Sequence, residues 1–148
     1  MSLVVGIDPD LKKSGVAVVS DGKLQTLDVL KLLDLIEFIS EHKHCAHFVI
    51  ENVNHDKATY IRPGTNKNVM QNISQKVGMV KAIGAVLEEI LTDLGAEFTS
   101  MKPLRGSVKK AKNDAELFNR MTGWEGKSNQ DKRDAALLAL SYTGKLGR

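Results

Sequence analysis

The chain has 148 residues, about one domain's length, and its 42% hydrophobic and 26% charged residues are typical of a folded globular protein rather than a disordered one. It carries 21 Lys and Arg against 18 Asp and Glu, a net charge of +3, and its single cysteine, Cys45, excludes an internal disulfide framework and fits a reducing compartment. No run approaches the roughly 18 apolar residues of a membrane span, and the N-terminus does not resemble a signal peptide, so we expect a cytoplasmic protein.

The first third of the chain predicts strands followed by one helix. Residues 3–7 form an apolar run typical of a central strand, and residues 15–19 predict a second strand. Asp21-Gly22 predicts a hairpin turn into a third strand at 23–29. The hydrophobic period then becomes helical, and we expect a helix that Asp28 caps. Its apolar stripe comprises Leu30, Leu32, Leu33, Ile36 and Ile39.

The middle of the chain predicts a strand, a loop and a long helix. Residues 48–50 are a short apolar strand, and residues 53–68 are polar and contain Pro63-Gly64, which indicates a surface loop. Apolar residues spaced by three and four from 70 to 94 predict a long helix that Gly95 ends. Residues 96–101 predict the last strand.

Two helices are predicted after the last strand. Asn113 and Glu116 form a capping-box pattern for a short helix that ends near Gly123. Ser128 begins the final helix, which ends near Gly144. Three early strands, then helix, strand, helix, strand and helices, predict an α/β domain with a mixed sheet.

Four carboxylates occupy positions from which they can converge. Asp8 directly follows the first strand, and Glu51 follows the strand at 48–50 in the same way. Asp131 and Asp134 lie three residues apart at the start of the last helix, on the face that continues into its apolar stripe. An acid on a core-facing helix surface is unfavourable unless it is paired or binds a metal. The hard oxygen ligands of such a cluster suit Mg²⁺ or Mn²⁺.

Each of these acids also has a simpler interpretation. Asp131 fits the third helical position of a Ser128 capping box, and Asp8 before Pro9 fits an ordinary turn. Any single acid is therefore weak support for a site, whereas the combination of two strand ends and a helical pair is much stronger. Two metal ions roughly 3.5–4 Å apart can activate a water and stabilise the leaving oxygen of a phosphodiester.

The basic residues are segregated from the acids. Residues 57–87 and residues 98–113 each contain five Lys or Arg and no acid, so the other 101 residues hold 11 bases and 18 acids. Such segments favour a polyanionic partner, although a solvated helix face is the usual role of lysine-rich stretches. The candidate DNA-binding residues are Arg62, Lys67, Lys76, Lys81, Lys102, Arg105, Lys109, Lys110 and Lys112.

Several motifs occur in an order that resembles a known nuclease family. They are residues 4–9, 14–19, 48–51, 73–78, Pro103 with 108–110, and 131–136. Together they resemble the RuvC-type Holliday-junction resolvases of the ribonuclease H-like superfamily, from about residue 3 to residue 142. The resemblance implies one nuclease domain over 1–148, with a ribonuclease H-like five-stranded mixed sheet flanked by helices. It also implies that the four carboxylates are the catalytic acids and that Lys109, Lys110 and Lys112 lie near the scissile phosphate.

The resemblance further implies an activity. We expect a metal-dependent endonuclease that resolves four-way or other branched DNA junctions, with Mg²⁺ or Mn²⁺, two ions per active site. The near two-fold symmetry of a junction calls for a homodimer. We expect it in the cytoplasm of a bacterial or phage-infected cell. The alternatives are another ribonuclease H-like nuclease, for ribosomal RNA or branched DNA in general, a nucleotide-phosphate-binding module of the actin and sugar-kinase type, and a catalytically silent junction-binding protein.

Three features depart from the family pattern or stand outside it. The family usually has Gly where this chain has Asp10, and because Asp tolerates left-handed backbone geometry we interpret Asp10 as a turn residue. The family's aromatic residue after the catalytic Glu is missing from residues 52–54, so Tyr60 is either a replacement junction wedge or an uninvolved loop residue. Residues 42–47 contain three His and Cys45, but they fall at a helix-to-strand turn without a second ligand pair at zinc-finger spacing.

Overall fold

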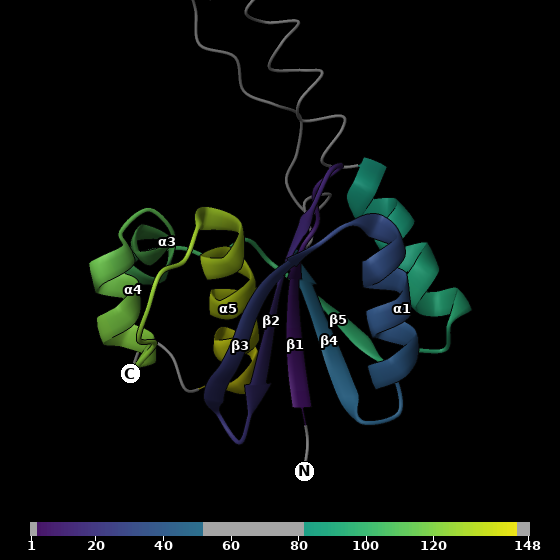
Figure 1. The fold of residues 1–148 in the computed structure, drawn as a ribbon, viewed down its shortest axis with the longest axis horizontal. Coiled ribbons are helices and arrows are strands. Elements are labelled where there is room, and N and C mark those ends of the chain that lie inside the picture. The colour runs from purple at the N-terminus through teal and green to yellow at the C-terminus, as the bar shows by residue number, and fades with distance from the viewer. Residues whose placement is uncertain (1–2, 52–81, 145–148) are drawn as a thin grey trace, which may run out of the picture.

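A five-stranded mixed sheet forms the centre of the molecule in the computed structural model, which describes residues 3–51 and 82–144 (Figure 1). The strand order is β3-β2-β1-β4-β5; β1 pairs antiparallel with β2 and β2 with β3, whereas β1–β4 and β4–β5 are parallel pairs. The predicted ribonuclease H-like mixed sheet flanked by helices is confirmed. The strands are β1 Leu3–Asp8, β2 Ser14–Ser20, β3 Lys23–Leu30, β4 Ala46–Glu51 and β5 Phe98–Met101.

Helices cover both faces of this sheet. Helix α1, Leu32–His42, and a helix at 82–93 lie on one face, and α5, Gln130–Thr143, lies on the other (Figure 1). Helices α3, Ser107–Lys112, and α4, Ala115–Thr122, pack on the outer side of α5. No helix within the described ranges is long and apolar enough to cross a membrane.

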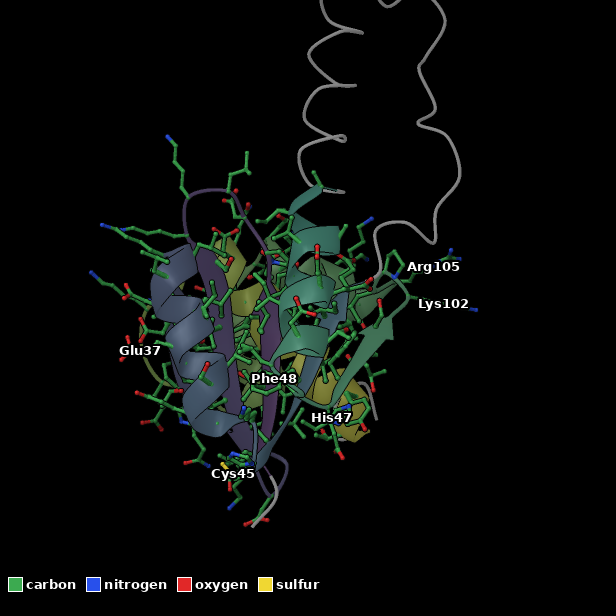
Figure 2. The ribbon with its side chains drawn as sticks, turned by 90° about the vertical axis from the view of Figure 1, so that its right-hand side faces the viewer. Glu37, Cys45, His47, Phe48, Lys102 and Arg105 are labelled. Atoms are coloured by element: carbon green, nitrogen blue, oxygen red, sulfur yellow. The ribbon has the colours of Figure 1, made fainter. Side chains whose placement is uncertain are left out.

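Alternation along the strands divides the core between the two faces. On β1, Val5 and Ile7 point to the side of α1, where Phe48 lies between the sheet and the helices (Figure 2). Gly6 and Ala17 face α5 instead. Because every second residue of a strand points to the same side, residues 4, 6 and 8 share the α5 face. This parity carries Asp8 toward α5.

The hairpin between β2 and β3 follows the sequence closely. Asp21 has a φ of 53° and Gly22 a φ of 77°, so both central residues are left-handed. Positive φ at both positions is the requirement of the turn that matches strand twist in a two-residue hairpin, and Asp-Gly is among the pairs that adopt it most easily. The prediction of a hairpin at this dipeptide is confirmed.

The predicted cap of α1 is wrong, and of the predicted stripe only Ile39 is fully buried on the helix. Strand β3 stays paired as far as Leu30, opposite Ser14, so Asp28 lies inside the strand and Lys31 precedes the helix without a side-chain cap. The helical residues that reach the core are Leu35 and Ile39, whereas Leu33 is 79% exposed. The apolar run at 30–33 spans the end of β3 and the start of α1, so its residues do not form one buried helical stripe.

The caps of the last two helices also differ from prediction. Asp114, not Asn113, accepts a hydrogen bond from the Leu117 N–H at 3.1 Å and caps α4. Asn129, not Ser128, accepts from the Lys132 N–H at 2.8 Å and caps α5. Both displaced side chains have other partners, because Asn113 accepts a hydrogen bond from Gln130 and Ser128 accepts one from Arg133. The predicted helix ends at Gly123 and Gly144 are confirmed.

The described residues include only part of the long predicted helix. Residues 82–93 are helical, with Ile83, Leu87 and Leu91 buried, and Gly95 follows with a φ of 73°. The end of this helix is confirmed. Its predicted beginning and the predicted loop at 53–68 lie outside the described residues.

Candidate active site

Two strand ends bring the first pair of carboxylates together. Strands β1 and β4 are parallel neighbours, and Ile7 pairs with Ile50. Asp8 and Glu51 are the next residue of each strand, so both end at the same edge of the sheet. The sequence-based expectation that they emerge side by side is therefore met by the register of the backbone.

Two glycines bring helix α5 into backbone contact with this part of the sheet. A Cβ atom on Gly6 would overlap the carbonyl oxygen of Ala135, and one on Gly15 would overlap the carbonyl oxygen of Asp131. Gly15 is also the residue that pairs with Asp8 across β1 and β2. The absent side chain at position 15 therefore lets the first turn of α5, with Asp131, lie beside the end of β1.

The carboxyl groups of Asp8 and Asp134 interact directly. Asp134 is only 5% exposed, and its side chain hydrogen bonds with that of Asp8. Burial, reinforced by the negative charges of Asp134 and Asp131, raises the pKa of Asp8 from 3.8 to about 9, against the opposing charge of Lys112. Asp8 therefore keeps its proton at neutral pH when no cation neutralises the cluster.

Lys112 is the cation that the structure brings to these acids. Its Nζ lies 3.6 Å from Asp134 Oδ2, and its side chain is about one-third exposed. Burial works to lower the pKa of Lys112, but the charges of Asp134, Asp8 and Glu51 outweigh it and raise this pKa above the ordinary value. All three named carboxylates are thus close enough to act on one ammonium group.

Arg133 is a site residue that the sequence did not single out. It is 8% exposed, and its guanidinium donates hydrogen bonds to the backbone carbonyl of Lys112 and to Ser128. A signal was present, because Arg133 lies one helical turn before the apolar stretch at Ala136 and Leu137. A charged residue on that face needs several hydrogen-bond partners.

The donor set suits a hard divalent cation. Asp8, Glu51, Asp131 and Asp134 supply carboxylate oxygens from β1, β4 and α5, and the raised pKa of Asp8 shows that Lys112 does not neutralise the buried charge. Among the described residues, no three carboxylate, imidazole or thiolate groups stand close enough to enclose an ion. The side chains fit the ion by their chemistry and charge.

The remaining basic candidates divide into exposed and undescribed positions. Lys102 and Arg105 follow β5 and point away from the protein (Figure 2), and Lys109 and Lys110 are exposed on α3. All four therefore face solvent, unlike Lys112. The other candidates lie outside the described residues: Tyr60, Arg62, Lys67, Lys76 and Lys81.

Asp10 lies in the connection between β1 and β2, in agreement with its interpretation as a turn residue. Its Oδ1 accepts the Leu11 N–H at 2.7 Å, and its own N–H donates to Ser14 Oγ at 3.2 Å. These hydrogen bonds close the turn without a positive φ at Asp10.

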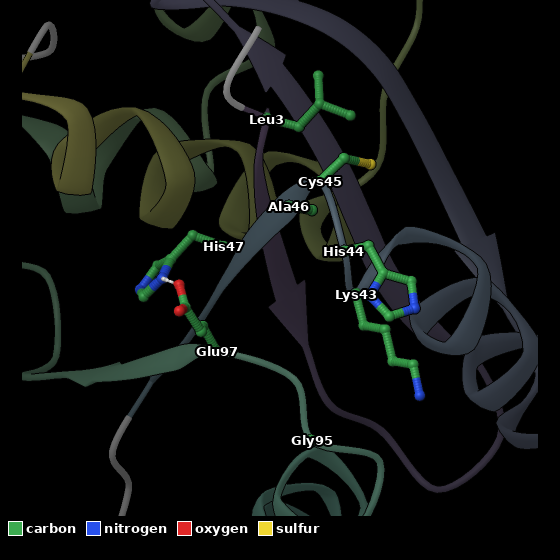
Figure 3. Close-up of a pocket in the computed structure, with 8 residues that line it drawn as sticks. All are labelled: Leu3, Lys43, His44, Cys45, Ala46, His47, Gly95 and Glu97. Carbon is green, nitrogen blue, oxygen red and sulfur yellow. Dashed lines mark ion pairs between the residues drawn. The ribbon is translucent and has the colours of Figure 1, made fainter.

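The histidine-rich segment contributes to packing rather than to a metal cluster. His42 Nδ1 donates to the Phe38 carbonyl at 2.8 Å, and the two rings stack. His47 is hydrogen bonded to Thr99 at 2.7 Å and lies 3.9 Å from Glu97. His47 and Glu97 border a pocket of about 500 Å³ in which His44 and Cys45 point away from His47 (Figure 3). The pocket lies at the start of β4, the opposite end of that strand from Glu51.

Comparison with known proteins shows similarity at the level of structure. No protein-family model matches the sequence, and no curated protein matches it. The solved structure of RuvC from Thermus thermophilus in complex with a Holliday junction substrate is similar, with a TM-score of 0.59 and 20% identity. That similarity covers 99% of this chain and 98% of the RuvC chain. A second structure of RuvC from Thermus thermophilus has a TM-score of 0.55 and 19% identity, with 97% of this chain and 98% of the other covered.

The shared features extend beyond the sheet to the order of its strands and helices, because the similarity spans almost every residue of both chains. Sequence identity at this level leaves the fold as the common property. Over nearly its whole length, this chain therefore has the ribonuclease H-like fold of the RuvC Holliday-junction resolvases.

Proposed function

We propose that this chain is a metal-dependent, structure-selective endonuclease that resolves four-way or other branched DNA junctions by paired phosphodiester hydrolysis. The observation that carries the proposal is the arrangement of four carboxylates: Asp8 and Glu51 end neighbouring parallel strands, Asp134 hydrogen bonds with Asp8, and the charge of Asp131 acts on Asp8. The fold supports it, because the similar RuvC of Thermus thermophilus has been solved with a Holliday junction substrate. Residues 1–148 form one nuclease domain in this proposal.

The four carboxylates hold Mg²⁺ or Mn²⁺, two ions in each active site. Such ions, when bound, lower the pKa of a water and stabilise charge on the leaving oxygen of a phosphodiester. Asp8 would give up its proton to serve as a ligand, since carboxylates bind cations in the ionised form. Lys112 keeps a positive charge beside Asp134, where it also attracts a scissile phosphate.

DNA is bound through the basic segments at 57–87 and 98–113, which lie between Glu51 and Asp131 in the sequence. Exposed lysines and arginines neutralise phosphates and make binding steeply dependent on salt. Tyr60 is the proposed junction wedge. The proposed phosphate contacts are Arg62, Lys67, Lys76, Lys81, Lys102, Arg105, Lys109, Lys110 and Lys112.

The active form is a homodimer in the cytoplasm of a bacterial or phage-infected cell. A four-way junction has near two-fold symmetry, so two symmetric nicks require two active sites related by the same symmetry. Light scattering of the protein bound to a synthetic junction measures the stoichiometry. Two chains per junction are expected, and one chain per junction would contradict paired nicking.

Cleavage of a synthetic four-way junction with Mg²⁺ tests the activity. Wild-type protein should cut the junction in preference to plain duplex, a flap and an RNA–DNA hybrid. Asp8→Asn should still bind the junction while losing at least about 10³-fold in cleavage rate, because the metal site loses a charged ligand. Asp10→Asn is the matched control, since Asp10 is exposed and its side chain contacts the Leu11 N–H.

Two results would redirect this proposal. Preferential cutting of the RNA–DNA hybrid or of structured RNA would favour another nuclease on the same fold. Normal junction cleavage by Asp8→Asn would show that the assigned site is wrong.

A further inference from the structure

Arg133 holds together two segments that meet at the carboxylate cluster. Its Nε donates to the backbone carbonyl of Lys112 at 2.8 Å. Its Nη1 donates to the Ser128 carbonyl at 2.9 Å and to Ser128 Oγ at 3.1 Å. One buried guanidinium thus ties the last residue of α3 to the segment before α5 and to α5 itself.

The tie acts on a lysine whose other end reaches the acids. The backbone of Lys112 is held by Arg133, and its Nζ lies 3.6 Å from the carboxylate of Asp134, the residue after Arg133. A second contact, from Gln130 Nε2 to Asn113 Oδ1 at 2.9 Å, joins the same two elements. Residues of α5 therefore contact Lys112 at both ends: Arg133 binds its backbone carbonyl, and Asp134 lies beside its Nζ.

An ammonium group in this position opposes cation binding. A divalent ion at Asp8 and Asp134 would sit beside the Lys112 ammonium, whose backbone carbonyl Arg133 holds. Like charges at short range repel, and the repulsion is stronger in a partly buried site than in water. The residue that keeps Lys112 in place therefore also affects how tightly the ion binds.

We propose that Arg133 is a positioning residue that holds Lys112 against the carboxylates, so that the lysine lowers the affinity of the site for divalent ions until DNA engages it. The inference rests on the proposed function, because it assumes that these acids bind a metal ion. A phosphate backbone supplies the negative charge that the Lys112 ammonium then binds in place of Asp134. DNA binding therefore draws the Lys112 ammonium away from the position where it opposes the ion.

The guanidinium is needed for its shape as well as its charge. Its Nε and Nη1 donors point in different directions and reach two backbone carbonyls from one side chain. A lysine at position 133 keeps the charge but presents a single nitrogen, which cannot hold the Lys112 and Ser128 carbonyls in the same geometry. Arg133→Lys therefore separates the positioning role from a charge effect.

Titration calorimetry with Mn²⁺ alone, on the whole chain and without DNA, tests the proposal. Lys112→Ala and Arg133→Lys should each bind Mn²⁺ about threefold more tightly than wild type, the size expected for a partly exposed charge contact. The double variant should bind no more tightly than Lys112→Ala, because both changes act through the same ammonium. Lys132→Gln removes one charge from the same helical turn and is the control for a long-range charge effect.

The outcomes are distinguishable from failure of the nuclease proposal. Absence of Mn²⁺ binding by wild type, or binding that survives Asp8→Asn, contradicts the metal site itself. Arg133→Lys that binds Mn²⁺ like wild type, or whose effect adds to that of Lys112→Ala, overturns the positioning role. A merely structural role for Arg133 predicts weaker binding, not tighter binding.

A second variant, Ser128→Ala, tests the proposal in case Arg133→Lys does not fold. Ser128→Ala removes one of the three acceptors of Arg133 and leaves the apolar core intact. It should tighten Mn²⁺ binding by a smaller factor, and the gain should vanish when Lys112 is alanine. Unchanged or weaker binding by Ser128→Ala would count against the proposal.

Discussion

The two faces of the sheet are packed by different kinds of side chain. The face under α1 and the helix at 82–93 is filled by large apolar residues. The face under α5 also contains Phe118 and Leu137, but small residues line the contact between helix and sheet, so their backbones touch. The large residues are Val5, Ile7, Leu35, Ile39, Phe48, Ile50, Leu87 and Leu91. The small ones are Gly6, Gly15, Ala17, Ala135, Ala136 and Ala139.

This difference explains why the carboxylates gather on one face. Aspartate has a short side chain, so acids from a helix and a strand meet only if their backbones lie close together. Close approach at Gly15 puts Asp131 beside the end of β1, and Asp134 follows one turn later against Asp8. On the opposite face, large side chains fill the space between the helices and the sheet. Tight packing on one side is therefore a requirement of the site.

Gly6→Ala should have the largest effect on stability. The added methyl would overlap the Ala135 carbonyl, which is backbone and cannot rotate away, so α5 must shift from the sheet. We expect a loss of about 3 kcal/mol or more in the free energy of unfolding. Urea denaturation followed by circular dichroism measures this loss, and junction cleavage should fall with it. If Gly6→Ala is as stable as wild type, α5 can move away from the sheet without loss of stability, which would contradict this prediction.

Asp8→Asn should stabilise the metal-free protein at neutral and alkaline pH. In the unfolded chain Asp8 ionises near pH 3.8, whereas in the folded protein its pKa is about 9. The wild type therefore has its full stability below about pH 4 and loses stability as the pH rises toward about 9, because only the unfolded chain releases this proton. The variant removes that loss, and its melting temperature at pH 8 should exceed that of wild type by about 3 °C or more.

Mg²⁺ provides the control for this comparison. The ion should raise the melting temperature of the wild type, since it neutralises the same carboxylates, and should have little effect on Asp8→Asn. A variant that melts below wild type at pH 8 without metal would contradict the electrostatic strain assigned to Asp8.

Ile39→Val tests the opposite face. Ile39 is fully buried between α1 and the sheet, and removing one methylene there should cost about 1 kcal/mol without moving any carboxylate. Unfolding in urea should show this loss, while the junction cleavage rate at a temperature well below melting stays at the wild-type value. A drop in cleavage similar to that of Gly6→Ala would show that the two faces are not independent.

Lys109→Ala and Lys110→Ala should give the smallest effects. Both side chains are exposed on α3, on the α5 side of the molecule, and each is expected to contact one phosphate. Each substitution should therefore weaken junction binding modestly and reduce the slope of log affinity against log salt by about 1. Lys23, exposed at the far hairpin, is the matched control, and Lys23→Ala should leave the slope unchanged. Equal slopes for all three variants would remove α3 from the proposed DNA surface.

Much of the fold is readable from local sequence. The apolar run at 3–7, the Asp21-Gly22 turn and the helix ends at Gly123 and Gly144 each depend on neighbouring residues and on backbone preferences, and the structure confirms them. Caps were less predictable. Asn113 and Ser128 have suitable side chains, but both are engaged by residues of α5 that are distant in sequence or lie beyond the cap.

The sequence by itself determined which carboxylates end strands and which share a helix face, because strand parity and helical spacing are local properties. Only the tertiary structure decided that Asp8 hydrogen bonds with Asp134, that Lys112 points inward while Lys109 and Lys110 face solvent, and that Arg133 holds Lys112. Those contacts join β1, α3 and α5, whose proximity comes from long-range packing across Gly6 and Gly15. No pattern within one segment encodes the distance between two others.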